Sequence, residues 1–143
     1  MNRLAVKLCL AGAALTLAAC SSMPDWMPGS GAMPVKLTGA EEVPPVSAAG
    51  SGSGSFRVAS DGTITGSVTT SGVQGTMAHI HRGAKGANGP IVVPLEKNGD
   101  TYTVPAGRKL TPQQMDDLKA GNLYVNVHTN ANKGGEVRGQ LAP

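Results

Sequence analysis

The sequence predicts an all-β domain, an antiparallel Greek-key β-sandwich or barrel. About seven or eight short stretches alternate apolar and polar residues with the period of a strand. Turn-forming Gly, Pro, Asn and Asp separate them, and one segment near 111–120 has the pattern of a short helix. Aromatic residues make up 3% of the chain, so we expect a core of Val, Leu, Ile and Ala.

Residues 1–19 have the features of a signal peptide. Arg3 and Lys7 give a basic start, and the apolar run over 8–19 is too short for a comfortable membrane span. The run ends in LAAC at 17–20, which resembles the lipobox of bacterial lipoproteins, and serine follows it. That resemblance implies a lipid such as palmitate on Cys20 and an exported protein anchored to the outer membrane, at its periplasmic face or its surface.

Residues 20–34 form a flexible tether in this interpretation, and the domain occupies 35–143. The tether is rich in Pro, Gly, Ser and Met, a composition that buries too little apolar surface to hold one conformation. Both cysteines, Cys9 and Cys20, precede the domain, so we expect no disulfide in it. Without the two basic residues of the signal peptide, ten basic residues face nine acidic ones, which argues against nucleic acid as a partner.

The first half of the domain is expected to contain strands at 35–39, 55–59, 63–70 and 77–81. The prolines at 44 and 45 exclude a central strand there, and the glycines of 50–54 predict a flexible segment. Asp61-Gly62 is the strongest hairpin signal in the chain. The Gly-rich loop 83–90 is interpreted as a turn, because it lacks the Lys-Ser/Thr pair of a phosphate-binding loop.

The second half is expected to contain strands at 91–95, 101–104, 123–129 and 136–141, the first two paired around Asn98-Gly99. The helix predicted between the strands at 101–104 and 123–129 has Thr111 as its N-cap, Gln114 completing a capping box and Gly121 at its end. Its core-facing residues are expected to be Leu110, Met115 and Leu118.

All three histidines of the chain lie on predicted strands and face away from the aliphatic side. Successive side chains in a strand alternate between faces, so His79 and His81 share one face. His128 lies opposite the aliphatic residues of 123–129 in the same way. If the two strands are neighbours, three imidazoles meet on one side of the sheet, and such a cluster predicts a metal site.

Met77 is the candidate fourth ligand, and Asn126 is a candidate for orienting an imidazole by a hydrogen bond. Imidazole suits Cu, Zn and Ni, a thioether favours Cu(I), and affinity in the divalent series peaks at copper. The donor set therefore predicts copper, as Cu(I) or Cu(II). Zinc with an open water position is the alternative, and Glu136 is its only candidate general base.

A plainer interpretation makes the histidines ordinary polar residues of a solvated strand face. Glu136 and Arg138 likewise have two interpretations. They form an exposed pair on the last strand, or they are support residues around the metal ligands.

Five segments resemble the successive signatures of the CHRD domain, which is named after chordin. They are LTGAEEVPPV at 37–46, AHIHRG at 78–83, NGPIV at 88–92, AGNLYVNVHT at 120–129 and GGEVRGQL at 134–141. The resemblance implies a secreted all-β domain, which bacteria carry as a single unit. It also places His79, His81 and His128 inside the signature motifs.

A second resemblance concerns the histidine pattern. A His-x-His strand with a later histidine in a Greek-key barrel is similar to the copper site of copper-zinc superoxide dismutases, so the fold is expected to be superoxide-dismutase-like or immunoglobulin-like. The sequence departs from that family because it lacks a fourth copper histidine, a bridging histidine, a zinc cluster and the disulfide.

Three functions follow from the sequence. The first is an envelope lipoprotein that binds copper for storage, delivery or a redox role. The second is a non-catalytic module that holds a protein partner in the envelope, with structural histidines. The third is a metal-dependent enzyme, such as a weak dismutase or a hydrolase. The first two are preferred, and a homodimer is one way to complete a site that has three nitrogens per chain.

Overall fold

Alternating burial along the strands builds the expected sheet. In the computed structural model, which describes residues 31–143, β1 (Ala32–Thr38) buries Met33, Val35 and Leu37 and exposes the residues between them. The other strands are β2 (Ser51–Val58), β3 (Ile64–Ser71), β4 (Gly75–Arg82), β5 (Ile91–Pro94), β6 (Glu96–Asn98), β7 (Thr101–Thr103), β8 (Leu123–Thr129) and β9 (Val137–Leu141). A short 3₁₀ helix, η1 (Gly39–Glu41), follows β1, and one α-helix, α1 (Pro112–Lys119), precedes β8.

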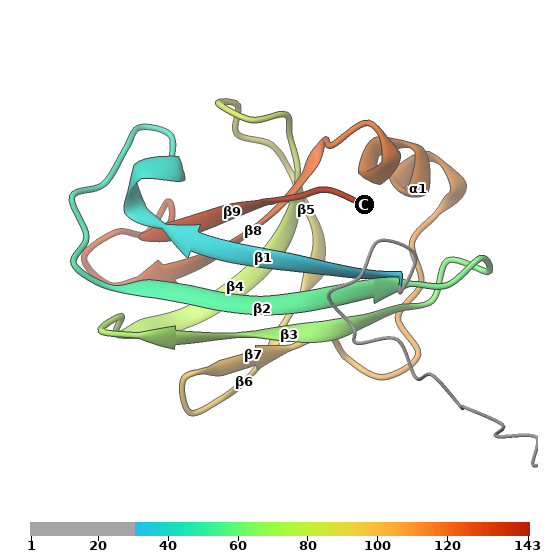
Figure 1. Cartoon of the computed structure of the whole chain (residues 1–143). Coiled ribbons are helices and arrows are strands. Elements are labelled where there is room, and N and C mark those ends of the chain that lie inside the picture. Colours follow the sequence, from blue (N-terminus) through green and yellow to red (C-terminus); the bar gives the residue numbers. More distant parts are fainter. Residues whose placement is uncertain (1–30) are drawn as a thin grey trace, which may run out of the picture.

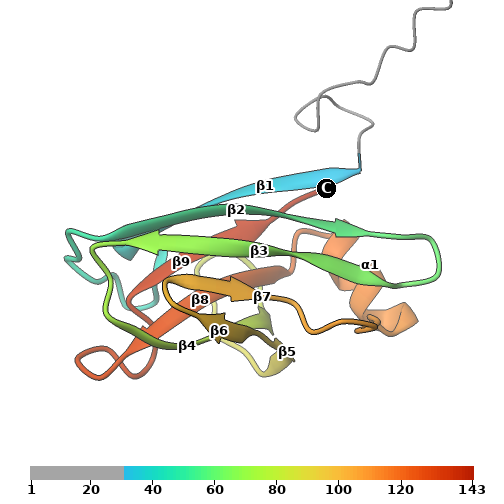
Figure 2. The same ribbon diagram turned by 90° about the horizontal axis from the view of Figure 1, so that it is seen from below.

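The nine strands form one antiparallel sheet in the order β5-β4-β8-β9-β1-β2-β3-β7-β6. The sheet curls on itself, so that β1, β2 and β3 lie across from β4 and β8 (Figures 1 and 2). At the closing side β6 returns beside β4, and the backbone N–H of Leu95 donates to the carbonyl of Ala78 at 3.0 Å. The predicted all-β sandwich or barrel is confirmed.

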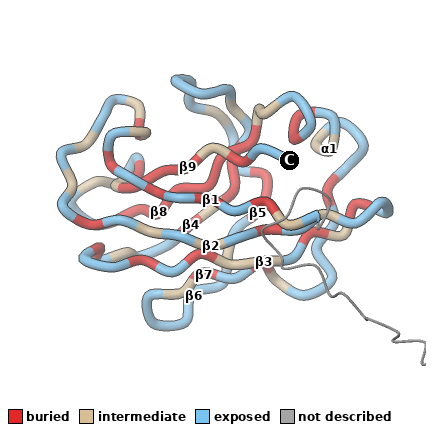
Figure 3. The backbone as a smooth tube through the Cα atoms, viewed as in Figure 1, coloured by how far each residue is buried: buried red, intermediate tan, exposed pale blue. Residues whose placement is uncertain are grey.

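The core lies inside this curled sheet (Figure 3). It consists mainly of Val, Leu and Ile from every long strand, as the sequence predicts. Phe56 and Tyr102 are also fully enclosed. Two of the three aromatic residues within 31–143 therefore lie in the core, where they bury a large apolar area.

β8 is the strand that positions the histidine site. It lies between β4 and β9, and all seven of its residues are buried. Leu123, Val125 and Val127 belong to the core. The alternate residues point to the opposite face, where loops cover them instead of solvent.

The helix forms as its capping residues predict. Thr111 Oγ1 accepts a hydrogen bond from the backbone N–H of Gln114 at 3.2 Å, and Gln114 Oε1 accepts one from the backbone N–H of Thr111 at 2.9 Å. Gly121 follows the last turn with a φ of 73°. Leu110 and Leu118 are buried, and Met115 packs against the same core.

The segment 50–54, expected to be flexible, belongs mostly to β2, which begins at Ser51. Gly52 and Gly54 permit close pairing with β3, because a Cβ on Gly54 would overlap the carbonyl oxygen of Ser67. These glycines serve the approach of two backbones and not flexibility.

Two further boundaries differ from expectation. β1 begins at Ala32, so the last residues assigned to the tether, including the buried Met33, belong to the domain. The segments 91–95 and 101–104 do not pair with each other, because β5 pairs with β4 while the short β6 pairs with β7 around Asn98-Gly99. This additional strand explains why the sheet has nine strands.

Within residues 31–143, no helix combines the length and the apolar content needed to cross a membrane. The predicted signal peptide, the lipidation site at Cys20 and most of the tether lie outside the described residues.

Candidate metal centre

Strand register places the three histidines on one face of the sheet. Directly opposed residues of antiparallel neighbours project from the same face, and three such rows cross the outer face of β5, β4, β8 and β9. The rows are Ile91–His81–Tyr124–Gln140, Pro94–His79–Asn126–Arg138 and Met77–His128. The strand neighbourhood on which the sequence-based metal site depends is therefore present.

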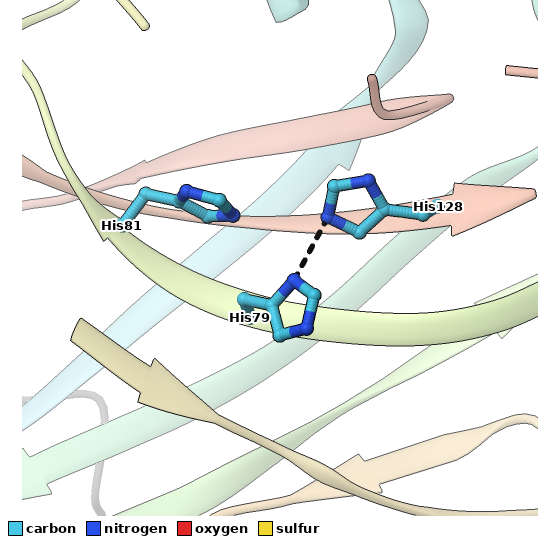
Figure 4. Close-up of side chains that lie close together, drawn as sticks. All are labelled: His79, His81 and His128. Atoms are coloured by element: carbon cyan, nitrogen blue, oxygen red, sulfur yellow. Dashed lines mark hydrogen bonds between the residues drawn. The ribbon is translucent and has the colours of Figure 1, made fainter. Parts of the chain in front are cut away.

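The imidazoles of His79, His81 and His128 converge from β4 and β8 (Figure 4). One ring nitrogen from each can be chosen so that the three lie within 4.8 Å of one another. His79 Nδ1 and His128 Nε2 are 3.0 Å apart. Metal–nitrogen bonds are about 2 Å long, so two nitrogens that share an ion lie no more than about 4 Å apart. The rings therefore need to shift by only about 1 Å for one ion to contact all three. The predicted convergence of the histidines is confirmed.

Two backbone carbonyls fix the tautomers of the more deeply buried rings. His81 Nδ1 donates to the carbonyl of Gly89 at 3.0 Å, and His128 Nδ1 donates to the carbonyl of Lys133 at 2.9 Å. A carbonyl only accepts, so Nδ1 carries the proton in each neutral ring and Nε2 carries a lone pair. A carbonyl on the far nitrogen of an imidazole is the usual support of a metal-bound histidine.

The lone pair of His81 has no partner. Its Nε2 atom is buried without a hydrogen bond, and the residue is 8% exposed. His128 Nε2 instead accepts from His79 Nδ1, because the His128 ring has its proton on Nδ1. The site therefore contains one buried nitrogen acceptor without a donor, His81 Nε2, and one histidine pair in which His79 Nδ1 donates a hydrogen bond to His128 Nε2.

The imidazoles of His79 and His81 are neutral at physiological pH. Burial, together with the nearby rings of His128 and His81, lowers the pKa of His79 to about 4. Burial also lowers the pKa of His81. Neutral rings keep the lone pairs that metal binding needs.

Arg138 contacts both Tyr124 and the loop 83–90, which in turn contact His81. It is 1% exposed, its guanidinium lies 3.4 Å from the centroid of the Tyr124 ring, and that ring stacks on His81 with centroids 5.0 Å apart. The guanidinium donates to three oxygens of the loop 83–90, the carbonyls of Ala84 and Ala87 and the Asn88 Oδ1. The same loop supplies the carbonyl that holds His81.

The expectation of an exposed Glu136–Arg138 pair is wrong. Arg138 is buried because the loop 83–90 folds over the outer face of β9. Glu136 Oε2 accepts from Thr129 Oγ1 at 2.6 Å and from Asn132 Nδ2 at 3.1 Å. Glu136 thus braces the turn that carries the Lys133 carbonyl, the acceptor for His128.

The other predicted site residues differ in burial. Met77 is the Cα partner of His128 and is 50% exposed. Asn126 is the Cα partner of His79 and is 2% exposed, and its Nδ2 donates to the carbonyl of Gly134 at 3.2 Å. Ligation by Met77 stays a prediction.

Glu42 is a buried carboxylate that the sequence interpretation missed. It is 4% exposed and lies close to Gly135 and Asn126, since a Cβ on Gly135 would contact Glu42 Oε1 and Asn126 Nδ2. Burial raises the pKa of Glu42 to about 7, although the charge of Arg138 and a hydrogen bond from Asn126 act in the opposite direction. The prolines that follow Glu42 marked an irregular segment but gave no sign that it folds over β8 and β9.

Glu42 should make the stability of the metal-free protein depend on pH. The pKa of Glu42 is about 7 in the folded state and about 4.5 in the unfolded chain. The contribution of Glu42 to the free energy of unfolding is therefore complete below pH 4.5. It falls by about 3 kcal/mol as the pH rises to 7. The depressed pKa of His79 produces an opposite slope in part of this range. The measured quantity is therefore the difference in free energy of unfolding between wild type and Glu42→Gln, by urea denaturation from pH 4.5 to 8. A difference that stays constant across this range would contradict the prediction.

Comparison with protein families gives one match. The model of the CHRD domain matches residues 33–141, a span that includes the three histidines, Glu42 and Arg138. No curated protein and no solved structure matches the chain. Because the family model covers well over half of the sequence, the chain belongs to the CHRD-domain family.

Proposed function

We propose that this CHRD-domain protein binds a transition metal, copper in the first place, through His79, His81 and His128. The observation that supports the proposal most is the buried His81 Nε2, which has a lone pair, no donor, and two further imidazoles beside it. A buried acceptor without a partner costs about 1–3 kcal/mol. A bound cation removes that cost and uses all three rings.

The way the rings are held supports a metal over a purely structural role. Structural histidines normally satisfy both ring nitrogens with protein groups. His81 departs from this pattern, because its Nδ1 donates to the Gly89 carbonyl while its Nε2 is buried without a partner. His128 has a protein partner on each ring nitrogen. His79 Nδ1 carries the proton of its hydrogen bond to His128 Nε2, so binding of an ion at His79 Nδ1 would move that proton to the Nε2 atom of the same ring.

Copper is proposed because neutral imidazoles favour it. Affinity for nitrogen donors in the divalent series is highest at Cu(II). The clustered metal-binding groups found within residues 31–143 are these three histidines, without a carboxylate. Zinc is the alternative, since three histidines are also a zinc ligand set.

The cellular setting is proposed from the first twenty residues. The signal-peptide pattern and Cys20 support an exported lipoprotein at the outer membrane. A copper site on such a protein fits storage, delivery or a redox role in the envelope.

The first experiment is a copper titration of the full-length protein in detergent, under reducing and oxidising conditions. We expect saturation at one ion per chain, and a loss of affinity of at least about 100-fold in the triple variant His79→Ala, His81→Ala, His128→Ala. Circular dichroism and urea denaturation of the variant serve as the control for folding. Wild-type protein that binds no copper, or a folded variant that binds it equally well, would overturn the proposal.

An envelope interaction module is the second candidate. Met77 and Ile91, large apolar side chains that are half-exposed, both lie in rows that contain the histidines. Exposed apolar residues grouped on one face favour a protein partner. In that case, Ile91→Ser should weaken binding to the partner, whereas the histidine variants should not.

A further inference from the structure

Asn126 lies on β8, on the same face of the sheet as the three histidines. It is directly opposite His79 in the pairing of β4 with β8, and it precedes His128 by two residues on the same face of β8. Its other neighbour along that face is Tyr124, the Cα partner of His81. At 2% exposed, it is more deeply buried than either His81 or His128, each of which is 8% exposed.

The surroundings fix which end of the amide faces the histidines. Asn126 Nδ2 donates to the carbonyl of Gly134, and the carboxylate of Glu42 lies on the same side, against Gly135. The Gly134 carbonyl can only accept a hydrogen bond, so the amide nitrogen belongs on that side. The amide oxygen then points the other way, toward β4.

The amide oxygen has no hydrogen-bond partner. Asn126 Oδ1 is buried and unsatisfied, as is His81 Nε2. Both side chains lie on the same outer face of the sheet, because Asn126 pairs with His79 and its neighbour on that face, Tyr124, pairs with His81. When the His81 ring is neutral, His81 Nε2 and Asn126 Oδ1 are both hydrogen-bond acceptors, so neither can serve as a donor to the other.

We propose that Asn126 Oδ1 is the fourth donor of the metal site. A cation contacts the two unsatisfied atoms and the remaining imidazoles at once. This inference rests on the proposed function and deepens it. It replaces the predicted role of Met77 as the fourth ligand, and it moves Asn126 from orienting an imidazole to binding the ion.

The oxygen donor determines which copper ion the site prefers. A thioether such as that of Met77 favours Cu(I), whereas three nitrogens and one oxygen form a set typical of Cu(II). The site is therefore selective for Cu(II), and Glu42 is a positioning residue that holds the Asn126 amide in the required orientation.

The test measures Cu(II) and Cu(I) affinities separately, by competition with chromophoric chelators, for full-length wild type, Asn126→Leu and Met77→Leu. Leucine is close to asparagine in size and has no donor atom. We expect Asn126→Leu to weaken Cu(II) binding by about tenfold and to leave Cu(I) binding unchanged. This difference would raise the reduction potential of the bound Cu(II)/Cu(I) couple by about 59 mV. The matched control Met77→Leu should change neither affinity.

The coordination sphere is tested directly by electron paramagnetic resonance of bound Cu(II). The spectrum of Asn126→Leu should differ from that of wild type, and the spectrum of Met77→Leu should not. If Asn126→Leu fails to fold, Asn126→Asp replaces it, because a carboxylate oxygen at the same position should keep or tighten Cu(II) binding.

Three outcomes overturn the inference without overturning the proposed function. They are unchanged Cu(II) affinity and spectrum in Asn126→Leu, weaker Cu(II) binding in Asn126→Asp, and loss of Cu(I) affinity in Met77→Leu. A water bridging the two unsatisfied atoms would leave the spectrum unchanged and thus counts against the inference. Failure of the proposed function has a different result, since wild type would then bind no copper at all.

Discussion

Replacement of Arg138 by methionine should lower the free energy of unfolding by about 3–5 kcal/mol, the usual effect of breaking a buried charged network. The guanidinium donates to the Ala84 and Ala87 carbonyls and to Asn88. Methionine leaves these oxygens without a donor and removes the positive charge that acts on the buried Glu42. Urea denaturation at neutral pH measures the change.

The same replacement should weaken metal binding. Without the guanidinium, the loop 83–90 loses the contacts that hold it over the sheet, and the Gly89 carbonyl no longer fixes the tautomer of His81. Arg138→Lys serves as the conservative variant, because it keeps the charge but not the fork of donors. We expect it to recover only part of the lost stability. A stability of Arg138→Met within about 1 kcal/mol of wild type would contradict this account.

Gly135→Ala should be the second large effect, a loss of about 2–4 kcal/mol. Gly135 has a φ of 130°, a conformation that alanine adopts only with strain. Its Cβ would also overlap Glu42 Oε1 and the amide nitrogen of Asn126. Both the stability of the fold and the affinity for Cu(II) should fall, as measured by denaturation and by the chelator competition.

The neighbouring glycine provides the matched control. A Cβ on Gly134 would meet nothing within 4 Å, so Gly134→Ala should change the free energy of unfolding by no more than about 0.5 kcal/mol. Equal effects of the two substitutions would show that flexibility of the turn, and not the contact with Glu42 and Asn126, is what the glycines provide.

Local patterns in the sequence predicted the parts of the fold that local chemistry determines. The capping box at Thr111, the hairpin at Asp61-Gly62 and the alternation in β1 each depend on residues a few positions apart. The facing of the three histidines followed from the same alternation. Their meeting also required β4 and β8 to be neighbours, which is a property of the whole sheet.

The errors of prediction have a common physical cause. Arg138 and Glu136 alternate with apolar residues, which normally indicates a solvated face. That face is covered instead by the loop 83–90 and by the segment around Glu42, and no short-range pattern records which loop folds over which strand. The unpartnered oxygen of Asn126 was hidden for the same reason.

The two carbonyl contacts that hold His81 and His128 come from the main chain of Gly89 and Lys133. Main-chain groups are common to all residues, so the identity of the side chain at position 133 has no bearing on the orientation of the His128 ring. What matters is the path of the backbone through two loops, one on either side of the imidazoles. Substitutions of side chains in these two loops should therefore leave the ring geometry unchanged, provided that the loops keep their lengths and their anchoring contacts. The proposed ion would meet two rings that the folded main chain already orients, so its exchange would not require the domain to refold.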